Sequence, residues 1–397
     1  MKRFLLIFLS LILLSFLSQA FAQGWDDIEK KAKGQIVYFN AWGGSQRIND
    51  YIQWAGQVVQ KKYGIRVIHV KATDIGDVVS RILVEKAAKK LQNGSVDLMW
   101  INGENFKAMK ENKLLYGPFS QNLPYFHLVN TKKKTLKFDF TVPVDNLESP
   151  WGMAQLVFSY DTNRVSKHPQ NMSDLLVFAR KNSGKFTYPA IPSFHGTTFI
   201  KQALSELIHD PKILSQKVSA PDFEKHTQPL WDFLDALHPL LWRKGKVFPT
   251  SGSQMLSLLN DNEIFISLSF NPNSVSNAIE NGELPNTIRT YIHEGGTIGN
   301  AHFVAIPFNS SAKQGAMVFA NFLLSPMAQA RKADPTIWGD PSVLDIGKLA
   351  GPDKALFDAV PKGVATLTAD ELGQSLPEPH VSWVQALEKE WLKKYSK

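Results

Sequence analysis

Apolar and polar residues follow a repeating order along the chain, in which short apolar runs alternate with amphipathic stretches. Residues 36–39 form an apolar run that predicts a strand, and the apolar positions within 48–63 fall on one face of a helix. Residues 65–70 are rich in β-branched side chains and predict a second strand, while residues 78–87 predict a second helix. Because parallel strands need crossover connections of this kind, the order predicts an α/β fold with a largely parallel sheet.

Two loops of this region follow predicted strands. Residues 42–45 come after the first strand, and residues 102–105 come after a third strand at 96–101, ahead of a helix at 106–115. In parallel sheets, ligands bind beside the carboxyl ends of the strands. We therefore expect the two loops to share one rim and to contact a ligand.

The pattern starts again near residues 149–152, which indicates a second α/β region. Its predicted strands are 153–160, 185–189 and 264–270, its predicted helices are 199–209 and 253–259, and residues 195–198 form a predicted loop. The chain then returns near 297–300 to a strand at 301–306 and a helix at 314–324. We expect one lobe to hold residues 23–150 and 300–350 and the other to hold residues 151–299. The sequence does not assign residues 351–397 to either lobe. Two crossings between lobes make a hinge.

The first 22 residues have the features of a signal peptide. A positive start is followed by an apolar run, and Ala20 and Ala22 give the small-residue pattern that signal peptidase reads. The alternative is a retained membrane anchor, but the run is shorter than the roughly 20 residues that span a bilayer. We therefore expect cleavage after residue 22 and an exported protein.

Composition narrows the classes of protein further. The 397 residues exceed the roughly 250–300 at which single cores stop growing, which predicts two domains. The chain has no cysteine, which excludes disulfides, thiolate metal ligands and a lipid-bearing cysteine, and with the signal peptide this favours the periplasm. The formal net charge is +8, but the one dense basic run, 132–134, is typical of a solvated loop, so no nucleic-acid partner is expected.

Several segments resemble bacterial extracellular solute-binding proteins of ABC importers. These segments are 95–100, 113–118 and 316–329, and the motifs at 188–190, 196–199, 296–300 and 333–341 resemble the thiamine-type branch of that class. The resemblance implies a type II periplasmic binding protein fold, with two lobes joined by a hinge and a mixed, mostly parallel sheet in each. It also implies a monomer that binds a small molecule, thiamine-like in this branch, between closing lobes and delivers it to an inner-membrane ABC permease.

The candidate ligand-binding residues share positions at strand ends, helix starts and lobe crossings. They are Trp42, Gly43, Gly44, Ser45, Asn102, Glu104, Trp151, Tyr188, Gly196, Thr197, Thr198, Asn271, Asn300, Trp338 and Asp340. Glycines let a backbone approach a ligand, helix starts offer free N–H groups, and tryptophan supplies a flat apolar wall. Each position also has a structural interpretation, as a tight turn, a helix cap or a packed aromatic side chain.

Two of these residues carry charge that a ligand could use. Glu104 or Asp340 beside an aromatic wall would suit a cationic ligand such as thiamine, although Glu104 could equally cap the helix that begins there.

The sequence carries none of the common catalytic signatures. It has no nucleophile elbow, no zinc-protease helix motif and no phosphate-binding loop, and its ten histidines lack metal-ligand spacing. We therefore expect a binding protein without a metal, a cofactor or an enzymatic activity. A periplasmic hydrolase and a ligand-sensing chemoreceptor protein remain the alternatives on the same fold.

Overall fold

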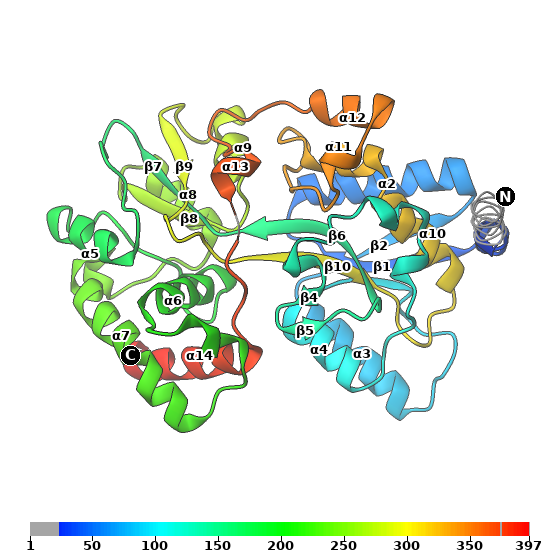
Figure 1. Cartoon of the computed structure of the whole chain (residues 1–397), viewed down its shortest axis with the longest axis horizontal. Helices are drawn as coiled ribbons and strands as arrows, with labels where there is room; N and C mark the ends of the chain where they lie inside the picture. The colour runs from blue at the N-terminus through cyan, green and yellow to red at the C-terminus, as the bar shows by residue number, and fades with distance from the viewer. Residues whose placement is uncertain (1–23, 374, 397) are drawn as a thin grey trace, which may run out of the picture.

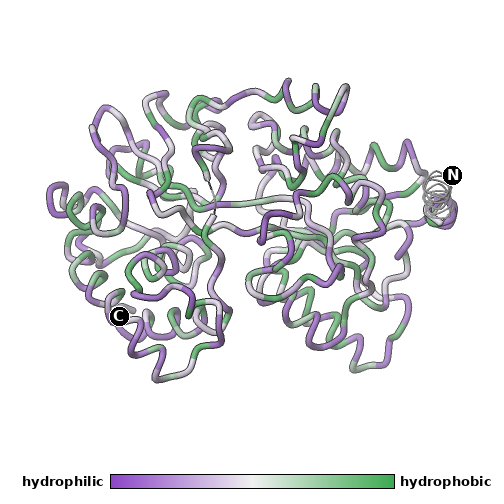
Figure 2. Tube along the Cα trace, in the orientation of Figure 1, coloured by the Kyte–Doolittle hydropathy of each residue, from purple (hydrophilic) through white to green (hydrophobic). Residues whose placement is uncertain are grey.

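A computed structural model describes residues 24–373 and 375–396, and it folds them into two lobes that lie side by side (Figure 1). The predicted signal peptide lies outside the described residues. Along the peripheral helices, hydrophobic residues alternate with hydrophilic ones, as expected for helices that cover a core (Figure 2). No helix in the described part of the chain is both long and apolar enough to cross a membrane.

The first lobe is built on a five-stranded sheet in the order β2-β1-β3-β10-β6. Its strands are β1 (Ile36–Trp42), β2 (Arg66–Ala72), β3 (Leu98–Ile101), β6 (Glu148–Gln155) and β10 (Gly299–Ala305). β1 is parallel to β2 and β3, whereas β10 is antiparallel to both β3 and β6. The carboxyl ends of the three parallel strands therefore meet at one edge of the sheet, beside the two strands that lead to the other lobe.

Helices cover both faces of this sheet (Figure 1). They are α2 (Gln46–Tyr63), α10 (Lys313–Leu323) and α11 (Pro326–Ala333) on one face, α3 (Ile75–Ala87) and α4 (Gly103–Glu111) on the other, with α12 (Gly351–Asp358) beside α11. A short hairpin, β4 (Phe138–Asp139) and β5 (Val142–Pro143), lies near α4. α2 ends at Tyr63, and Gly64 after it, with a positive φ of 69°, closes the last turn, while Asp74 caps α3.

The second lobe has a three-stranded sheet in the order β8-β7-β9. The strands are β7 (Val157–Asp161), β8 (Ile266–Ser269) and β9 (Ile288–Tyr291), and the surrounding helices are α5 (Met172–Lys181), α6 (Phe194–Leu207), α7 (Ala220–Leu237), α8 (Gly252–Asn260), α9 (Ser274–Glu280), α13 (Ala369–Leu372) and α14 (Val381–Tyr395). β7 pairs antiparallel with both neighbours. The mostly parallel arrangement expected in each lobe therefore holds between β1, β2 and β3 of the first lobe and not in the second.

Two local predictions in the second lobe are wrong. Residues 185–189, predicted as a strand, form no strand, because their backbone hydrogen bonds go to separate segments. The carbonyl of Lys185 accepts from the backbone N–H of Phe265, and the carbonyl of Phe186 accepts from the backbone N–H of Trp242. Residues 195–198, predicted as a loop before a helix, lie inside α6, which begins at Phe194. The hydroxyl of Ser193 accepts a hydrogen bond from the backbone N–H of Gly196 and so caps this earlier start.

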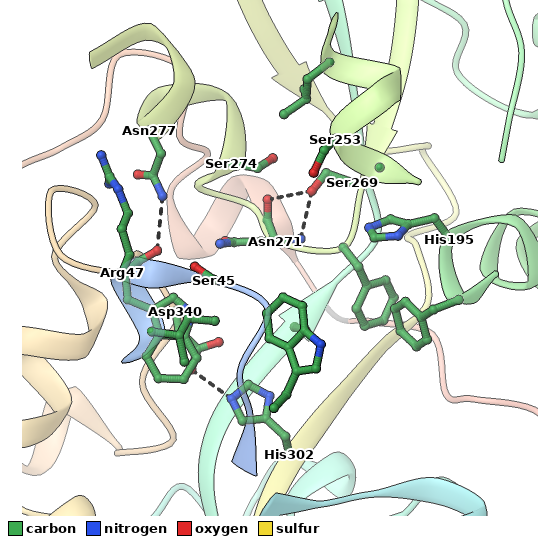
Figure 3. A pocket seen from close by; sticks show the side chains of 18 of the residues that line it. Ser45, Arg47, His195, Ser253, Ser269, Asn271, Ser274, Asn277, His302 and Asp340 are labelled. Atoms are coloured by element: carbon green, nitrogen blue, oxygen red, sulfur yellow. Dashed lines mark hydrogen bonds and ion pairs between the residues drawn. The ribbon is translucent and has the colours of Figure 1, made fainter. Parts of the chain in front are cut away.

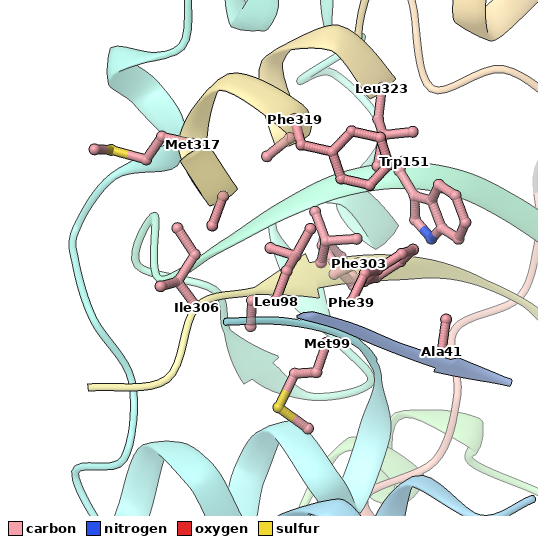
Figure 4. Packing of buried hydrophobic residues seen from close by; sticks show 14 of the residues in the cluster. Phe39, Ala41, Leu98, Met99, Trp151, Phe303, Ile306, Met317, Phe319 and Leu323 are labelled. Carbon is pink, nitrogen blue, oxygen red and sulfur yellow. The ribbon is translucent and has the colours of Figure 1, made fainter. Parts of the chain in front are cut away.

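Two separate hydrophobic clusters give each lobe its own core. The first contains Phe39, Trp151, Phe303 and Phe319, which pack between the large sheet and α10 (Figure 4). The second begins at Leu156 and includes the side chains of β7, β8 and α6. Buried residues change cluster between 151 and 156 and again between 298 and 301, so β6 and β10 carry the chain across (Figure 1).

The C-terminal segment makes a third crossing between the lobes. Phe357 of α12 packs against the first cluster, whereas Ala365 belongs to the second. Beyond it, α14 supplies Trp383, Leu387 and Trp391 to the core of the second lobe. The described residues from 351 to 396 are therefore shared between the lobes, whereas the sequence pattern indicates only two crossings.

Candidate ligand-binding site

A cavity of about 820 Å³ lies between the lobes, beside the carboxyl ends of β1, β2 and β3. Its first-lobe residues include Trp42, Ser45, Arg47, Asp74, Trp100, Asn102, Asn300, His302, Trp338 and Asp340. Its second-lobe residues include Phe194, His195, Ser253, Leu256, Ser269, Phe270, Asn271, Ser274, Asn277 and Asn281. The volume falls in the range of small-molecule sites, and such sites favour positions between domains.

Aromatic side chains of the first lobe form a wall of this cavity. Trp100 lies 5.0 Å from His302 and 5.8 Å from Trp338, between ring centroids, and His302 is stacked on Trp338 at 6.0 Å with an interplanar angle of 19°. Trp42 at the end of β1 also lines the cavity and is 43% exposed, so its indole is accessible to a ligand. Flat side chains held in this way suit stacking against a ring.

The second lobe faces this wall with hydroxyl and amide groups (Figure 3). Ser253 lies in the first turn of α8, Ser269 ends β8, and Asn271 and Ser274 lead into α9. The backbone N–H of Asn271 donates to the Ser269 hydroxyl at 3.1 Å, which fixes this turn. Neutral donors and acceptors of this kind recognise polar substituents of a small ligand without requiring it to be charged.

The charge of Asp340 is balanced by the protein itself. Its carboxylate contacts the ammonium of Lys332, whose side chain is 0% exposed, and lies 3.1 Å from Nε2 of His302. The Lys332 ammonium also donates to the carbonyls of Asp340 at 3.0 Å and Pro341 at 2.9 Å. Burial lowers the pKa of Lys332, and Asp340 opposes that shift. The wall therefore presents a paired carboxylate instead of a free one.

The guanidinium of Arg47 is likewise engaged within the protein. It donates to the carbonyl of Pro335 at 2.9 Å and to the side-chain oxygen of Asn281 on the other lobe. Arg47 lines the cavity, but N–H groups of its guanidinium bond to one residue of each lobe and so link the two lobes.

The structure brings seven of the sequence-predicted site residues together around the cavity: Trp42, Ser45, Asn102, Asn271, Asn300, Trp338 and Asp340. Of these, Asn300 also donates to Glu378 at 2.9 Å, and Asn102 precedes the first turn of α4.

The other eight predicted residues lie outside the cavity lining. Gly43 and Gly44 belong to the same loop as Trp42, where a Cβ would meet the side chain of Lys71 or of Trp42 itself. Trp151 is fully buried behind the aromatic wall, 5.0 Å from Trp100 between ring centroids.

Tyr188 and the α6 residues have partners within the second lobe. The Tyr188 hydroxyl is buried between Nε2 of His238, at 2.7 Å, and the indole N–H of Trp391, at 2.8 Å. Thr197 donates to Glu388 of α14 at 2.6 Å, and Thr198 donates to the carbonyl of Phe194 at 2.7 Å. A Cβ on Gly196 would lie 2.2 Å from the carbonyl oxygen of Pro189, so this position needs a glycine for close packing. Glu104 lies in the first turn of α4.

Several lining residues escaped the sequence analysis. Trp100 and His302 lie inside strands, where an aromatic side chain is usually a packing residue. Arg47, His195 and Asn277 lie within helices. Arg47 and His195 had a local signal, because Arg47 follows the candidate Ser45 by two positions and His195 directly precedes the candidate Gly196.

Comparison with known proteins identifies the family. The model of the family described as "Bacterial extracellular solute-binding protein" matches residues 54–345. The chain belongs to this family. The resemblance to bacterial extracellular solute-binding proteins is therefore confirmed, and similar solved structures confirm the two-lobed binding-protein fold.

Similar proteins agree with this membership. Protein YnjB of Escherichia coli strain K12 is 45% identical over 385 residues, which cover 96% of this chain and 97% of that protein. The spermidine/putrescine ABC transporter substrate-binding protein PotD from Streptococcus pneumoniae superposes with a TM-score of 0.65 at 14% identity, covering 91% of this chain and 98% of PotD. An ABC transporter structure from Clostridium perfringens gives a TM-score of 0.63 at 14% identity, covering 91% and 98%.

These findings give the general role of the protein. It is a bacterial extracellular solute-binding protein. The description of the family indicates an extracellular location and a solute as the ligand.

Proposed function

We propose that this protein is a periplasmic, monomeric binding protein that closes on a flat, ring-bearing small molecule and delivers it unchanged to an inner-membrane ABC permease. The lobes are residues 23–150 with 300–350 and residues 151–299, and the signal peptide at 1–22 is removed on export. The ligand lies between Trp42, Trp338 and the second lobe.

The observation that carries this proposal is the different chemistry of the two cavity walls. The first lobe offers the indoles of Trp42, Trp100 and Trp338, whereas the second offers hydroxyls and amides beside the rings of Phe194 and Phe270. A ring stacked on one wall contributes about 0.5–1.5 kcal/mol beyond its buried area, and hydrogen bonds from the other wall fix its orientation. Micromolar affinity corresponds to roughly −8 kcal/mol, which a buried ring and a few hydrogen bonds supply after ordering costs.

Thiamine is the specific ligand that we propose. It carries two flat rings, which suit the aromatic wall, and only a single positive charge. A polyamine needs several free carboxylates along its length. Of the three carboxylates that line the cavity, Asp340 is paired with Lys332, Asp74 accepts from the backbone N–H of Gly76, and Glu283 accepts from Asn281, so this cavity fits polyamines less well.

A binding role without chemistry agrees with the hydrogen bonds of the two cavity histidines. Among the described residues, the ring nitrogens of His195 have no hydrogen-bond partner, and His302 bonds to Asp340 and to no lining hydroxyl. A hydrolase needs a base that reaches its nucleophile.

A thermal-shift titration tests the ligand. Thiamine should raise the melting temperature in a concentration-dependent way, because a ligand at 100 times its Kd stabilises the folded state by about 2.7 kcal/mol. Spermidine, the comparison compound, should have no effect at the same concentration. Stabilisation by spermidine alone would overturn thiamine as the ligand, and mass-spectrometric detection of an altered ligand would overturn binding without chemistry.

Replacing the accessible tryptophan tests the proposed contact. Trp42→Ala should weaken thiamine binding about tenfold, since the stacked ring loses its wall, and should leave the melting temperature of the free protein nearly unchanged. Phe138→Ala removes an aromatic ring that is similarly exposed but lies outside the cavity, so it is the matched control. Isothermal titration calorimetry measures the affinity of each variant for thiamine. Equal affinity in the two variants would contradict the stacking role.

A further inference from the structure

Three asparagines of the second lobe form a stripe along one face of α9. Asn273, Asn277 and Asn281 are spaced four residues apart, which places them on the same side of a helix. The first precedes α9, the second lies within it and the third follows its last residue. Each one bonds to a residue of the first lobe.

All three contacts involve first-lobe groups at the edge of the cavity. The amide of Asn277 donates to the carbonyl of Trp338 at 3.1 Å, and the amide of Asn273 donates to the carbonyl of Gly339. Asn281 accepts from the guanidinium of Arg47, which also holds the carbonyl of Pro335. The stripe therefore bonds to the loop 335–339 directly twice and through Arg47 once.

The orientation of the first amide is set before the lobes meet. The hydroxyl of Thr366 donates to the side-chain oxygen of Asn273 at 2.7 Å, which leaves the NH₂ group to face Gly339. The backbone N–H of Asn273 in turn donates to the side-chain oxygen of Asn271 at 2.9 Å. Because these partners belong to the second lobe and the C-terminal crossing, Asn273 keeps its donor aimed outward when the lobes separate.

Gly339 makes the close approach possible. Its φ is +78°, and a Cβ there would lie 2.7 Å from the Cβ of Asn273. Any larger residue would be strained at this φ and would also push the stripe away.

We propose that this stripe is a latch, in which Asn273, Asn277 and Asn281 hold the two lobes together in the absence of ligand. The acceptors are the carbonyls of Trp338 and Gly339, and the Trp338 ring is part of the aromatic wall. Forming the latch therefore also fixes the wall. The ligand and the latch favour the same closed arrangement, so the latch lowers the amount of binding energy that closure requires.

The absence of cysteine from the chain permits a direct test in the ligand-free protein. Cysteines introduced at the exposed positions Gln53 on α2 and Asp261 after α8 place one fluorescent dye on each lobe. Single-molecule energy transfer then reports the ratio of open to closed molecules. Asn277→Ala should raise that ratio about five-fold, and Asn273→Ala should do the same, because each loses one interlobe hydrogen bond of ordinary strength.

Two further variants make the test decisive. Asn260→Ala removes an exposed asparagine at the end of α8 that has no side-chain hydrogen bond among the described residues, and it should leave the ratio unchanged. Gly339→Ala should open the lobes by a steric route while all three asparagines remain. Circular dichroism of each variant checks that it is folded.

Unchanged energy transfer in folded Asn273→Ala, Asn277→Ala and Gly339→Ala proteins would overturn the latch. Opening in the Asn260→Ala control as well would also overturn it, because the effect would then not belong to the stripe. No ligand is added, so this outcome is independent of whether thiamine is the ligand.

Discussion

At the scale of single residues, the first lobe contains two buried carboxyl groups, those of Asp139 and Glu148. Both oxygens of Asp139 accept from the backbone N–H of Gly103, at 2.9 and 2.8 Å, next to the lining residue Asn102. Burial raises the pKa of Asp139 to about 8, with Glu104 and Glu378 adding to the shift and the Gly103 N–H opposing it. Burial also raises the pKa of Glu148, whose two oxygens have no hydrogen-bond partner among the described residues.

This pair predicts a pH dependence of stability. Between the ordinary pKa of 3.8 and a pKa of about 8, folded Asp139 keeps a proton that the unfolded chain has released, so the free energy of unfolding falls as the pH rises through this window. Asp139→Asn should reduce that fall, and Asp139→Asn with Glu148→Gln should reduce it further. Urea unfolding at pH 5 and pH 8 measures the difference. Glu111→Gln, at an exposed position, should keep the wild-type slope; a wild-type slope in the double variant would refute the role of the pair.

Three of the residues that the sequence placed at the cavity end or follow strands. Trp42, Asn102 and Asn271 each end or follow a β-strand, and the rule that ligands lie at such positions needs no knowledge of packing. Trp100 and His302 could not be placed in this way, because the side of the sheet that becomes a cavity depends on the second lobe. Tyr188 is a residue type that often occurs in binding sites, but its hydroxyl accepts a hydrogen bond from Trp391, more than 200 positions away along the chain. The sequence alone does not reveal such a long-range partner.

At the scale of elements, α6 connects the second lobe to the hinge. Its Lys201 ammonium lies 2.6 Å from the carboxylate of Glu378, and both side chains are almost fully buried. Asn300 of β10 donates to the other oxygen of Glu378. The sequence did not predict this cluster, because its three members come from α6, from β10 and from the C-terminal segment.

Breaking this ion pair should be costly. Lys201→Met leaves Glu378 buried without its partner, and the free energy of unfolding should fall by about 3–5 kcal/mol. Lys201→Met combined with Glu378→Gln should recover a large part of that loss, since no unpaired charge remains. Guanidinium unfolding measures both variants, with the exposed Lys212→Met as control. A single variant as stable as the control would show that the pair contributes little.

At the scale of the whole molecule, the two cores are separate and the C-terminal helix belongs to the second one. The sequence pattern predicts two crossings between lobes, because strands and helices repeat on either side of them. It could not locate the third crossing, because residues 359–364 lack an apolar period and the contacts of Ala365 and Trp383 are long-range. For the same reason, the sequence could not assign residues 351–397 to a lobe.

Because the two cores are separate, a substitution in α14 should destabilise the second lobe and leave the first lobe unaffected. Trp383→Ala in α14 removes a fully buried indole and should destabilise the second lobe by about 3–5 kcal/mol. Hydrogen exchange should show faster exchange in β7, β8 and α6, while amides of β1 and α2 keep their protection. Equal acceleration in both lobes would show that they unfold as one unit.

The position of α14 also has a consequence for the order in which the protein is made. A ribosome releases residues 24–151 long before β10 and α10, which the first core requires, and it releases Trp383 and Trp391 of α14 later still. The first core can be completed only after Leu344 has emerged, and the second lacks two tryptophans until α14 emerges. Each core therefore stays incompletely packed through most of the synthesis of the residues that form it.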